Sequence, residues 1–371
     1  MASGIASSWH DKLMLTLDEI KVLPKVLLHD HLDGGLRTQT ILELADEIGW
    51  TPHLPTTDLA LLQQWFTRGA ASKDLLQYLA TFEHTLAVMQ TAESIERVAA
   101  EAVIDLAADG VRYAEVRFAP ELHQQGALHL EAVVEAVQAG FRRGESEAAH
   151  DGTAIRVNTI VCAMRTEPRS LEIAKLAVAM RDRDEYVVAF DLAGAETGWP
   201  PSLHQPALEH IRRNQMHLTI HASEPPDLDL ITDALALGAE RIGHGVRLLA
   251  DCRDVDFATG SMRMGRVATA ILERQVPLEL APTCNVQIGA VSSIGHHPIG
   301  PFLRAGFRVN INTDNRLMSN VSVSSEVHAV TQAFSLSRAE VGRVALNGID
   351  ASFGEWAERQ QIRRELMAAY A

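Results

Sequence analysis

Two histidines are separated by one residue in the stretch HDHLDGG at positions 29–35. In a β-strand, residues i and i+2 point to the same face, so the imidazoles of His29 and His31 are expected to lie side by side. Imidazole nitrogens bind borderline cations such as Zn²⁺. An HxH pair alone is weak evidence and more often belongs to a polar turn, so other residues have to distinguish a metal site from a turn.

Two further residues of metal-binding type end other apolar segments. His221 ends HLTIH and Asp314 ends NINTD. In isolation, such a histidine is often satisfied by backbone groups and such an aspartate often caps a helix. Three imidazoles and one carboxylate, however, satisfy Zn²⁺ and leave a position for water, as in catalytic rather than structural sites. The four residues together therefore favour a metal site.

Groups suited to proton transfer lie close to these residues in the sequence. Glu224 follows His221 by three positions, and His244 ends the segment RIGH. A carboxylic acid and an imidazole beside a metal ion are the groups that metal-assisted hydrolysis uses to move protons. Gly194, at the end of DLAG, offers a backbone N–H that a planar ligand can approach closely, although a simple turn is an equal alternative.

Eight short β-branched or aromatic runs, each followed by a helical pattern, have to position these groups. The predicted strands are 25–31, 112–120, 155–164, 186–194, 217–223, 241–245, 276–283 and 308–314. Such alternation predicts parallel pairing through right-handed crossovers, and eight units close a barrel with its active site at the carboxyl ends of the strands. The expected fold class is α/β, a (β/α)8 TIM-type barrel with additional helices.

The expected domain organisation is a single domain over residues 1–371. It includes a helical insertion at 36–93 that acts as a lid and a helical C-terminal tail at 324–371. A doubly wound open sheet is the competing fold. It is disfavoured because no GxGxxG or phosphate-binding loop follows a strand, and because polar residues end nearly every strand.

The composition restricts the classes of partner. The 371 residues include 33 Lys+Arg and 48 Asp+Glu, a formal net charge of −15. Nucleic acids and anionic membranes select basic surfaces, so a small neutral or cationic substrate is favoured over both. The three cysteines form no CxxC pattern, and no run of about 18 apolar residues occurs. We therefore expect a cytoplasmic protein that binds no nucleic acid and no membrane.

The ordered set of motifs HDHLDGG, DLAG, HASE, GHGVR, PTCN and NTDN resembles that of the adenosine deaminase family of amidohydrolases, from about residue 20 to 340. The resemblance implies a (β/α)8 barrel with one Zn²⁺ per chain. It implies the metal ligands His29, His31, His221 and Asp314.

The same resemblance assigns roles to the remaining groups. It implies that Glu224 protonates the purine ring at N1 and that His244 assists the attacking hydroxide. The backbone N–H of Gly194 is expected to donate to N3, and Asp33 to bind the ribose 5′-hydroxyl. Substrate contacts are thus expected at His31, Asp33, Gly194 and Asn315.

Two positions depart from the family pattern. Ser223 stands where most members have glycine, and Asn315 stands where they have a second aspartate that contacts the purine N7. An amide can donate to N7 directly, so Asn315 is compatible with this contact. Relatives that act on free adenine typically have Glu or Asn where Asp33 stands. Asp33 therefore favours a nucleoside with a free 5′-hydroxyl.

The resemblance thus predicts zinc-dependent hydrolysis of adenosine and 2′-deoxyadenosine to inosine, or 2′-deoxyinosine, and ammonia. A deaminase of adenine or another 6-aminopurine nucleoside is the alternative. A binuclear amidohydrolase is disfavoured because no Lys ends the fourth strand, and cytidine-deaminase chemistry because no PCxxC pair occurs. A non-catalytic nucleoside-binding relative is also disfavoured, since the expected acid, base and ligands are all present.

Overall fold

The computed structural model describes residues 14–73 and 75–371, so the predicted domain's residues 1–13 and residue 74 lie outside the described part. Eight strands form one sheet in the order β1-β2-β3-β4-β5-β6-β9-β10, and each pairs in parallel with its neighbour. They are Lys25–His31 (β1), Val111–Phe118 (β2), Arg156–Met164 (β3), Val187–Ala193 (β4), His217–Ala222 (β5), Arg241–His244 (β6), Leu278–Leu280 (β9) and Val309–Ile311 (β10).

The first and last strands meet, which nearly closes the sheet into a barrel. A β-bridge joins Asp30 to Asp314. The N–H of His31 donates to the carbonyl oxygen of Asp314 at 2.7 Å, and the N–H of Asp314 donates to the carbonyl oxygen of His29 at 3.0 Å. The predicted (β/α)8 TIM-type barrel is therefore confirmed, with each strand within three residues of its predicted bounds.

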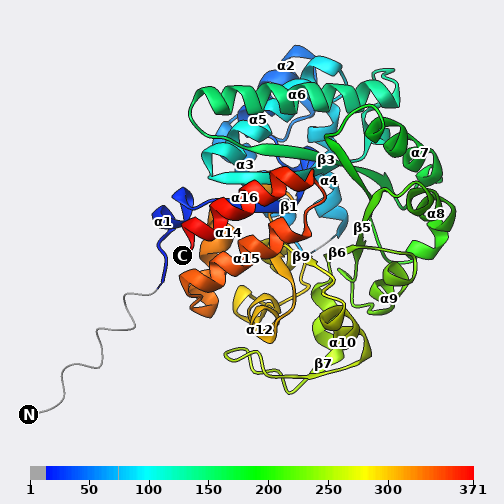
Figure 1. Ribbon diagram of the computed structural model, residues 1–371. Coiled ribbons are helices and arrows are strands. Elements are labelled where there is room, and N and C mark those ends of the chain that lie inside the picture. Colours follow the sequence, from blue (N-terminus) through cyan, green and yellow to red (C-terminus); the bar gives the residue numbers. More distant parts are fainter. Residues whose placement is uncertain (1–13, 74) are drawn as a thin grey trace, which may run out of the picture.

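Helices surround the barrel (Figure 1). In chain order they are α1 (Leu17–Val22), α2 (Thr38–Glu47), α3 (Leu59–Ala70), α4 (Leu75–Ala87), α5 (Ala92–Ala108), α6 (Leu130–His150), α7 (Ser170–Arg181), α8 (Gln205–Arg213), α9 (Asp229–Ala236), α10 (Arg266–Glu273), α11 (Pro282–Gln287), α12 (Ile299–Ala305), α13 (Arg316–Ser319), α14 (Val323–Phe334), α15 (Arg338–Ala351) and α16 (Trp356–Ala369). The stretch 36–93 contains α2, α3 and α4, and the tail contains α15 and α16.

One small sheet was not predicted. Strands β7 (Cys252–Arg253) and β8 (Arg263–Met264) pair in antiparallel fashion beside α10. Each has two residues, which is too short for a period-2 hydrophobic pattern to be recognised in the sequence.

The tail helix α15 begins at a capping box and packs against the barrel near its C-terminal end. Ser337 and Glu340 form a capping box, in which each side chain accepts from the backbone N–H of the other residue. Farther along the helix, Gly348 packs against Val26 of β1, and a Cβ atom at Gly348 would lie 3.0 Å from the Val26 side chain. The glycine therefore allows α15 to approach β1 closely.

Arg241 connects the barrel interior to this tail. It is 1% exposed and pairs with Glu115 and Glu279, each at 2.6 Å. It also donates to the carbonyl oxygen of Ala351 at 3.0 Å and lies over the ring of Phe353. Barrel interiors usually contain layers of branched aliphatic side chains, so this part of the interior is unusually charged.

No helix of the described residues is both long and apolar enough to cross a membrane.

Because Arg241 compensates two buried carboxylates, Arg241→Met should lower the free energy of unfolding by about 3–5 kcal/mol. Arg363 pairs with Asp350 at 2.8 Å, with both side chains 36% exposed, so Arg363→Met is a matched control that should cost at most about 1 kcal/mol. Denaturant unfolding of both variants measures the difference. Equal losses of unfolding free energy in the two variants would show that the ion pairs of Arg241 do not stabilise the fold more than the exposed pair does.

Candidate active site

The four predicted metal ligands converge at the carboxyl end of the barrel. Nε2 of His31 lies 3.3 Å from Nε2 of His221 and 3.4 Å from Oδ1 of Asp314. Nε2 of His29 lies 3.4 Å from the same aspartate oxygen. The ligand atoms come from the ends of β1 and β5 and from the residue three positions after β10, so the barrel positions them independently of their separation in sequence.

The spacing fits a tetrahedral divalent ion. Zn–N distances of about 2.0–2.1 Å in a tetrahedral site place ligand atoms about 3.3–3.4 Å apart, which matches the three separations given above. Nε2 of His29 is buried and has no hydrogen-bond partner among the described residues. A donor set of imidazole nitrogens and one carboxylate suits zinc better than magnesium or calcium. The residues therefore fit the metal that the family implies.

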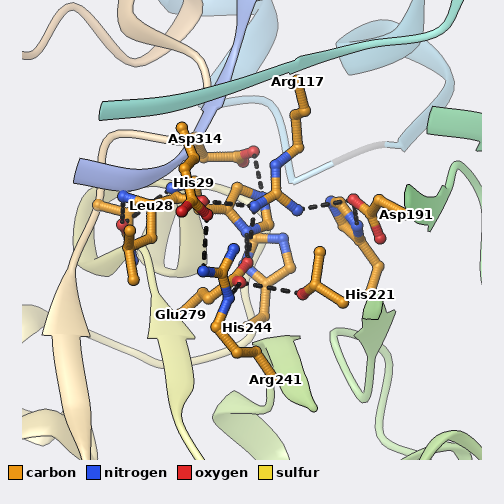
Figure 2. A network of polar contacts seen from close by, with 12 residues as sticks. Leu28, His29, Arg117, Asp191, His221, Arg241, His244, Glu279 and Asp314 are labelled. Carbon is orange, nitrogen blue, oxygen red and sulfur yellow. Dashed lines mark hydrogen bonds and ion pairs between the residues drawn. The ribbon is translucent and has the colours of Figure 1, made fainter. Parts of the chain in front are cut away.

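Two buried carboxylates orient the histidines (Figure 2). Nδ1 of His29 lies 2.8 Å from Glu279, and Nδ1 of His221 lies 2.9 Å from Asp191. Arg117, which is fully buried, bridges the two carboxylates at 2.6 Å from Asp191 and 2.7 Å from Glu279. Such carboxylate partners fix the ring orientation and make Nε2 the nitrogen that faces a metal.

The arginines also keep Glu279 charged. Burial alone would raise the pKa of this carboxyl, but the guanidinium groups of Arg117 and Arg241 hold the pKa well below its usual range. An ionised carboxylate accepts a hydrogen bond from Nδ1–H of His29, which leaves the lone pair of Nε2 directed into the site. Arg117 and Arg241, which do not line the cavity, thus keep Glu279, the partner of His29, ionised.

The two groups expected to move protons lie next to each other. Oε1 of Glu224 is 3.6 Å from Nε2 of His244, which ends β6. Glu224 also lies close to Asp314 and Cys284. Burial raises the pKa of Glu224, and its remaining exposed surface lines the cavity. The raised pKa favours the protonated acid that donation to a substrate requires.

His244 is near enough to be confused with a ligand. His29, His221, His244 and Asp314 each offer a ligand atom within 4.8 Å of the others. His244 differs because no carboxylate of the described residues holds its Nδ1, which instead lies 3.3 Å from the side-chain amide nitrogen of Asn285. The three shared groups and either His31 or His244 would complete a four-ligand set.

The backbone before Glu224 is held in an unusual conformation. Ser223 has φ of +65°, in the left-handed region that favours glycine. Glu196 accepts hydrogen bonds from the N–H groups of Ser223 at 2.7 Å and Glu224 at 3.2 Å. Burial raises the pKa of Glu196 to about 7. The serine thus adopts the conformation expected of the family glycine, and Glu196 supports the turn that presents Glu224.

A cavity of about 440 Å³ opens above these groups. The metal-ligand candidates His31, His221 and Asp314 line it, together with Glu224 and His244. This volume lies within the usual range for small-ligand sites.

Helix α4 of the insertion contributes Tyr78, Phe82 and Leu86 to the lining. Asn315 also lines the cavity and donates from its amide nitrogen to the hydroxyl of Tyr78. Gly34 lies against the same amide, and a Cβ at this position would be 2.0 Å from Oδ1 of Asn315. The absence of a side chain at Gly34, in the motif HDHLDGG, thus leaves space for the amide of Asn315.

Asp33 and Gly194 lie where the sequence places substrate contacts. Both line the cavity. Oδ1 of Asp33 is buried without a hydrogen-bond partner among the described residues, and burial raises the pKa of this group to about 7. Gly194 has φ of +95°, which a residue with a side chain rarely adopts.

Several contributing residues were missed from the sequence. Glu279 is the single charge in the predicted strand 276–283, Arg117 is one of three charged residues in the predicted strand 112–120, and Asp191 belongs to the DLAG motif. Charged residues are almost never fully buried unless they are paired, so charges within predicted barrel strands were a usable signal. Nothing in the sequence pattern marked Tyr78 or Glu196.

Comparisons with known proteins point to one family. A family model described as adenosine deaminase matches residues 24–369. The adenosine deaminase of Mycolicibacterium vanbaalenii is 49% identical over 354 residues, which cover 95% of this chain and 96% of the relative. That of Mycobacterium bovis is 47% identical over 353 residues, or 95% of each chain.

Solved structures show the same architecture. An adenine deaminase from Arthrobacter aurescens superposes with a TM-score of 0.80 at 26% identity, covering 93% of this chain and 98% of that one. The N6-methyl-AMP deaminase of Arabidopsis thaliana gives 0.79 at 26% identity, covering 95% and 99%. With a matching family model and relatives near half identity along almost its entire length, the chain belongs to the adenosine deaminase family of hydrolytic deaminases.

Proposed function

We propose that this enzyme hydrolyses adenosine and 2′-deoxyadenosine to inosine or 2′-deoxyinosine and ammonia. The observation that carries the proposal is the convergence of His29, His31, His221 and Asp314 on one point beside Glu224. The cavity above that point is large enough for a small ligand and is lined mainly by apolar groups.

The proposal assigns one Zn²⁺ per chain to His29, His31, His221 and Asp314. Zinc held by these residues would lower the pKa of water to about 7 and would thereby make hydroxide available at neutral pH. His244 lies near this point but is not a ligand in this proposal, since its Nδ1 contacts Asn285 rather than a carboxylate. Glu279 and Asp191 hold the rings of His29 and His221 in the required orientation.

Glu224 acts as the acid in this proposal. Addition of oxygen to C6 of the purine pushes electrons onto N1, and a protonated carboxyl beside N1 stabilises that change by donating its proton. Burial raises the pKa of Glu224, which supports this role. His244, 3.6 Å from Glu224, is placed either to hold or to deprotonate the incoming oxygen nucleophile.

Substrate contacts are proposed at His31, Asp33, Gly194 and Asn315, all of which line or border the cavity. The backbone N–H of Gly194 would donate to N3, and the amide of Asn315 to N7. A carboxylate at Asp33 accepts a hydrogen bond from a 5′-hydroxyl but repels a 5′-phosphate. This residue supports a nucleoside over a nucleotide.

Adenine or another 6-aminopurine nucleoside is the alternative substrate. Two of the similar solved structures are an adenine deaminase and an N6-methyl-AMP deaminase, so the fold accommodates these reactions. With free adenine, however, the buried and unpartnered oxygen of Asp33 would gain no sugar hydroxyl. We therefore favour adenosine.

The proposal also includes the domain organisation, the cellular location and the partner of the enzyme. Residues 1–371 act as one deaminase domain, in which 36–93 forms the lid and 324–371 the supporting tail. The three cysteines are free, which supports a reducing cytoplasm. The partner is a small purine nucleoside, with no nucleic acid and no membrane.

Deamination is measured directly by the ultraviolet change on conversion of the purine. Purified enzyme should convert adenosine and 2′-deoxyadenosine, lose activity with a chelator, and regain it with zinc. Adenine and 5′-phosphorylated adenosine should react at least about 10²-fold more slowly, because Asp33 lacks its hydroxyl partner or faces a phosphate. Conversion of adenine but not adenosine would contradict the substrate assignment.

Glu224→Gln should lower kcat by about 10²–10⁴-fold while the zinc content stays the same, because the amide occupies the same volume but cannot donate an acidic proton. Glu365→Gln, an exposed change on α16, is the control and should keep wild-type turnover. Turnover of the Glu224 variant close to wild type would rule out the proton-donor role.

His221→Ala should lose most of its zinc, measured by elemental analysis of the purified protein, since one of the four metal ligands is removed. His217→Ala on the same strand is the matched control, because His217 is 46% exposed and pairs with Glu240 at the other end of β5. A full zinc complement in His221→Ala would count against this ligand.

A further inference from the structure

A buried chain of hydrogen bonds connects His244 to the backbone before α12. Nδ1 of His244 lies 3.3 Å from the amide nitrogen of Asn285. Oδ1 of Asn285 lies 3.1 Å from Nε2 of His297, and Nδ1 of His297 accepts from the N–H of Ile299 at 3.1 Å. His244, Asn285 and His297 are all at most 1% exposed. Asn285 and His297 do not border the cavity.

The direction of this chain follows from its backbone end. The N–H of Ile299 can only donate, so Nδ1 of His297 is an acceptor and carries no proton. Burial lowers the pKa of His297 to about 3, so the ring is neutral and its proton is on Nε2. Nε2–H therefore donates to Oδ1 of Asn285. The NH₂ group of Asn285, which can only donate hydrogen bonds, must then face His244.

The opposite direction would place two donors against each other. If the amide of Asn285 were rotated, its NH₂ group would face Nε2 of His297 and move the proton of that ring to Nδ1. That proton would then oppose the N–H of Ile299 across 3.1 Å. A buried donor without an acceptor costs about 1–3 kcal/mol, so the observed direction is favoured.

We infer that Asn285 and His297 are positioning residues that hold neutral His244 as the Nε2–H tautomer, so that His244 donates a hydrogen bond to the oxygen nucleophile and does not act as a base through Nε2. The donated bond to Nδ1 occupies the only other lone pair of the neutral ring. The inference deepens the proposed deamination and rests on it. The position of His244 beside Glu224 is compatible with two roles, holding the nucleophile and deprotonating it. The inference distinguishes between these roles.

Asn285→Asp reverses the chain with almost no change in shape. A carboxylate accepts from Nε2–H of His297 and also requires a proton on Nδ1 of His244. The neutral ring then presents a bare Nε2 to the site. We expect kcat to fall by about 10²–10⁴-fold, with KM and zinc content within about 3-fold of wild type, because a wrong tautomer leaves the geometry intact.

The tautomer is read by ¹⁵N NMR of zinc-loaded enzyme labelled at histidine, with the His244 signals identified by their loss in His244→Gln. Wild type should show protonated Nε2 and bare Nδ1 at His244, and Asn285→Asp the reverse. Asn214→Asp is the matched control. Its amide also lies beside a histidine, 3.5 Å from Nε2 of His210, but at the opposite end of the barrel. Turnover in this variant should match wild type.

A wild-type signal with protonated Nδ1 at His244 would overturn the inference, and so would an Asn285→Asp enzyme that deaminates as fast as wild type or faster. The second result is expected if His244 is a base. The wild-type spectrum decides the tautomer even where Asn285→Asp does not fold. If wild type fails to deaminate adenosine, the proposed function falls, whereas the spectrum still tests the chain.

Discussion

The guanidinium of Arg117 between two buried carboxylates is the interaction on which the site depends. Arg117 helps to keep both carboxylates ionised, together with Arg241 at Glu279 and His221 at Asp191, and ionised partners hold the rings of His29 and His221 in a fixed orientation. Buried ion pairs add little net stability compared with apolar side chains of similar volume. Their presence in a barrel of this kind is therefore explained by the positions that they impose on the histidines.

The closure of the barrel and the metal site depend on the same contact. The strands β1 and β10 meet through the bridge at Asp30 and Asp314, where the backbone of Asp314 exchanges hydrogen bonds with His29 and His31. Asp30 points away from the cavity and accepts from Thr313 at 2.7 Å. A shift of β10 along β1 would break the closing hydrogen bonds and move Asp314 out of reach of the two imidazoles. Fold and site are thus coupled through backbone geometry.

Most of the fold and the central residues of the site were predictable from the sequence, because both depend on local signals. His31, His221 and His244 lie at the ends of their strands or within two residues of them, so recognising the eight strands also brings these histidines to one mouth. The supporting residues were not predicted, since their roles arise from contacts across the barrel. Tyr78 meets Asn315 across 237 positions, and Arg117 meets Glu279 across 162. No periodicity in the sequence encodes such pairs.

Backbone strain is concentrated where these strands turn into their loops. Ser223, His244 and Asp314 have φ of +65°, +59° and +58°, a region that costs residues with a Cβ about 1–2 kcal/mol. At His244 and Asp314 the side chain is needed, so glycine cannot relieve the strain. Ser223 is different, because its hydroxyl is buried without a hydrogen-bond partner among the described residues. The two hydrogen bonds that Glu196 accepts are what stabilise this turn, so the orientation of Glu224 depends on Glu196 more than on the serine.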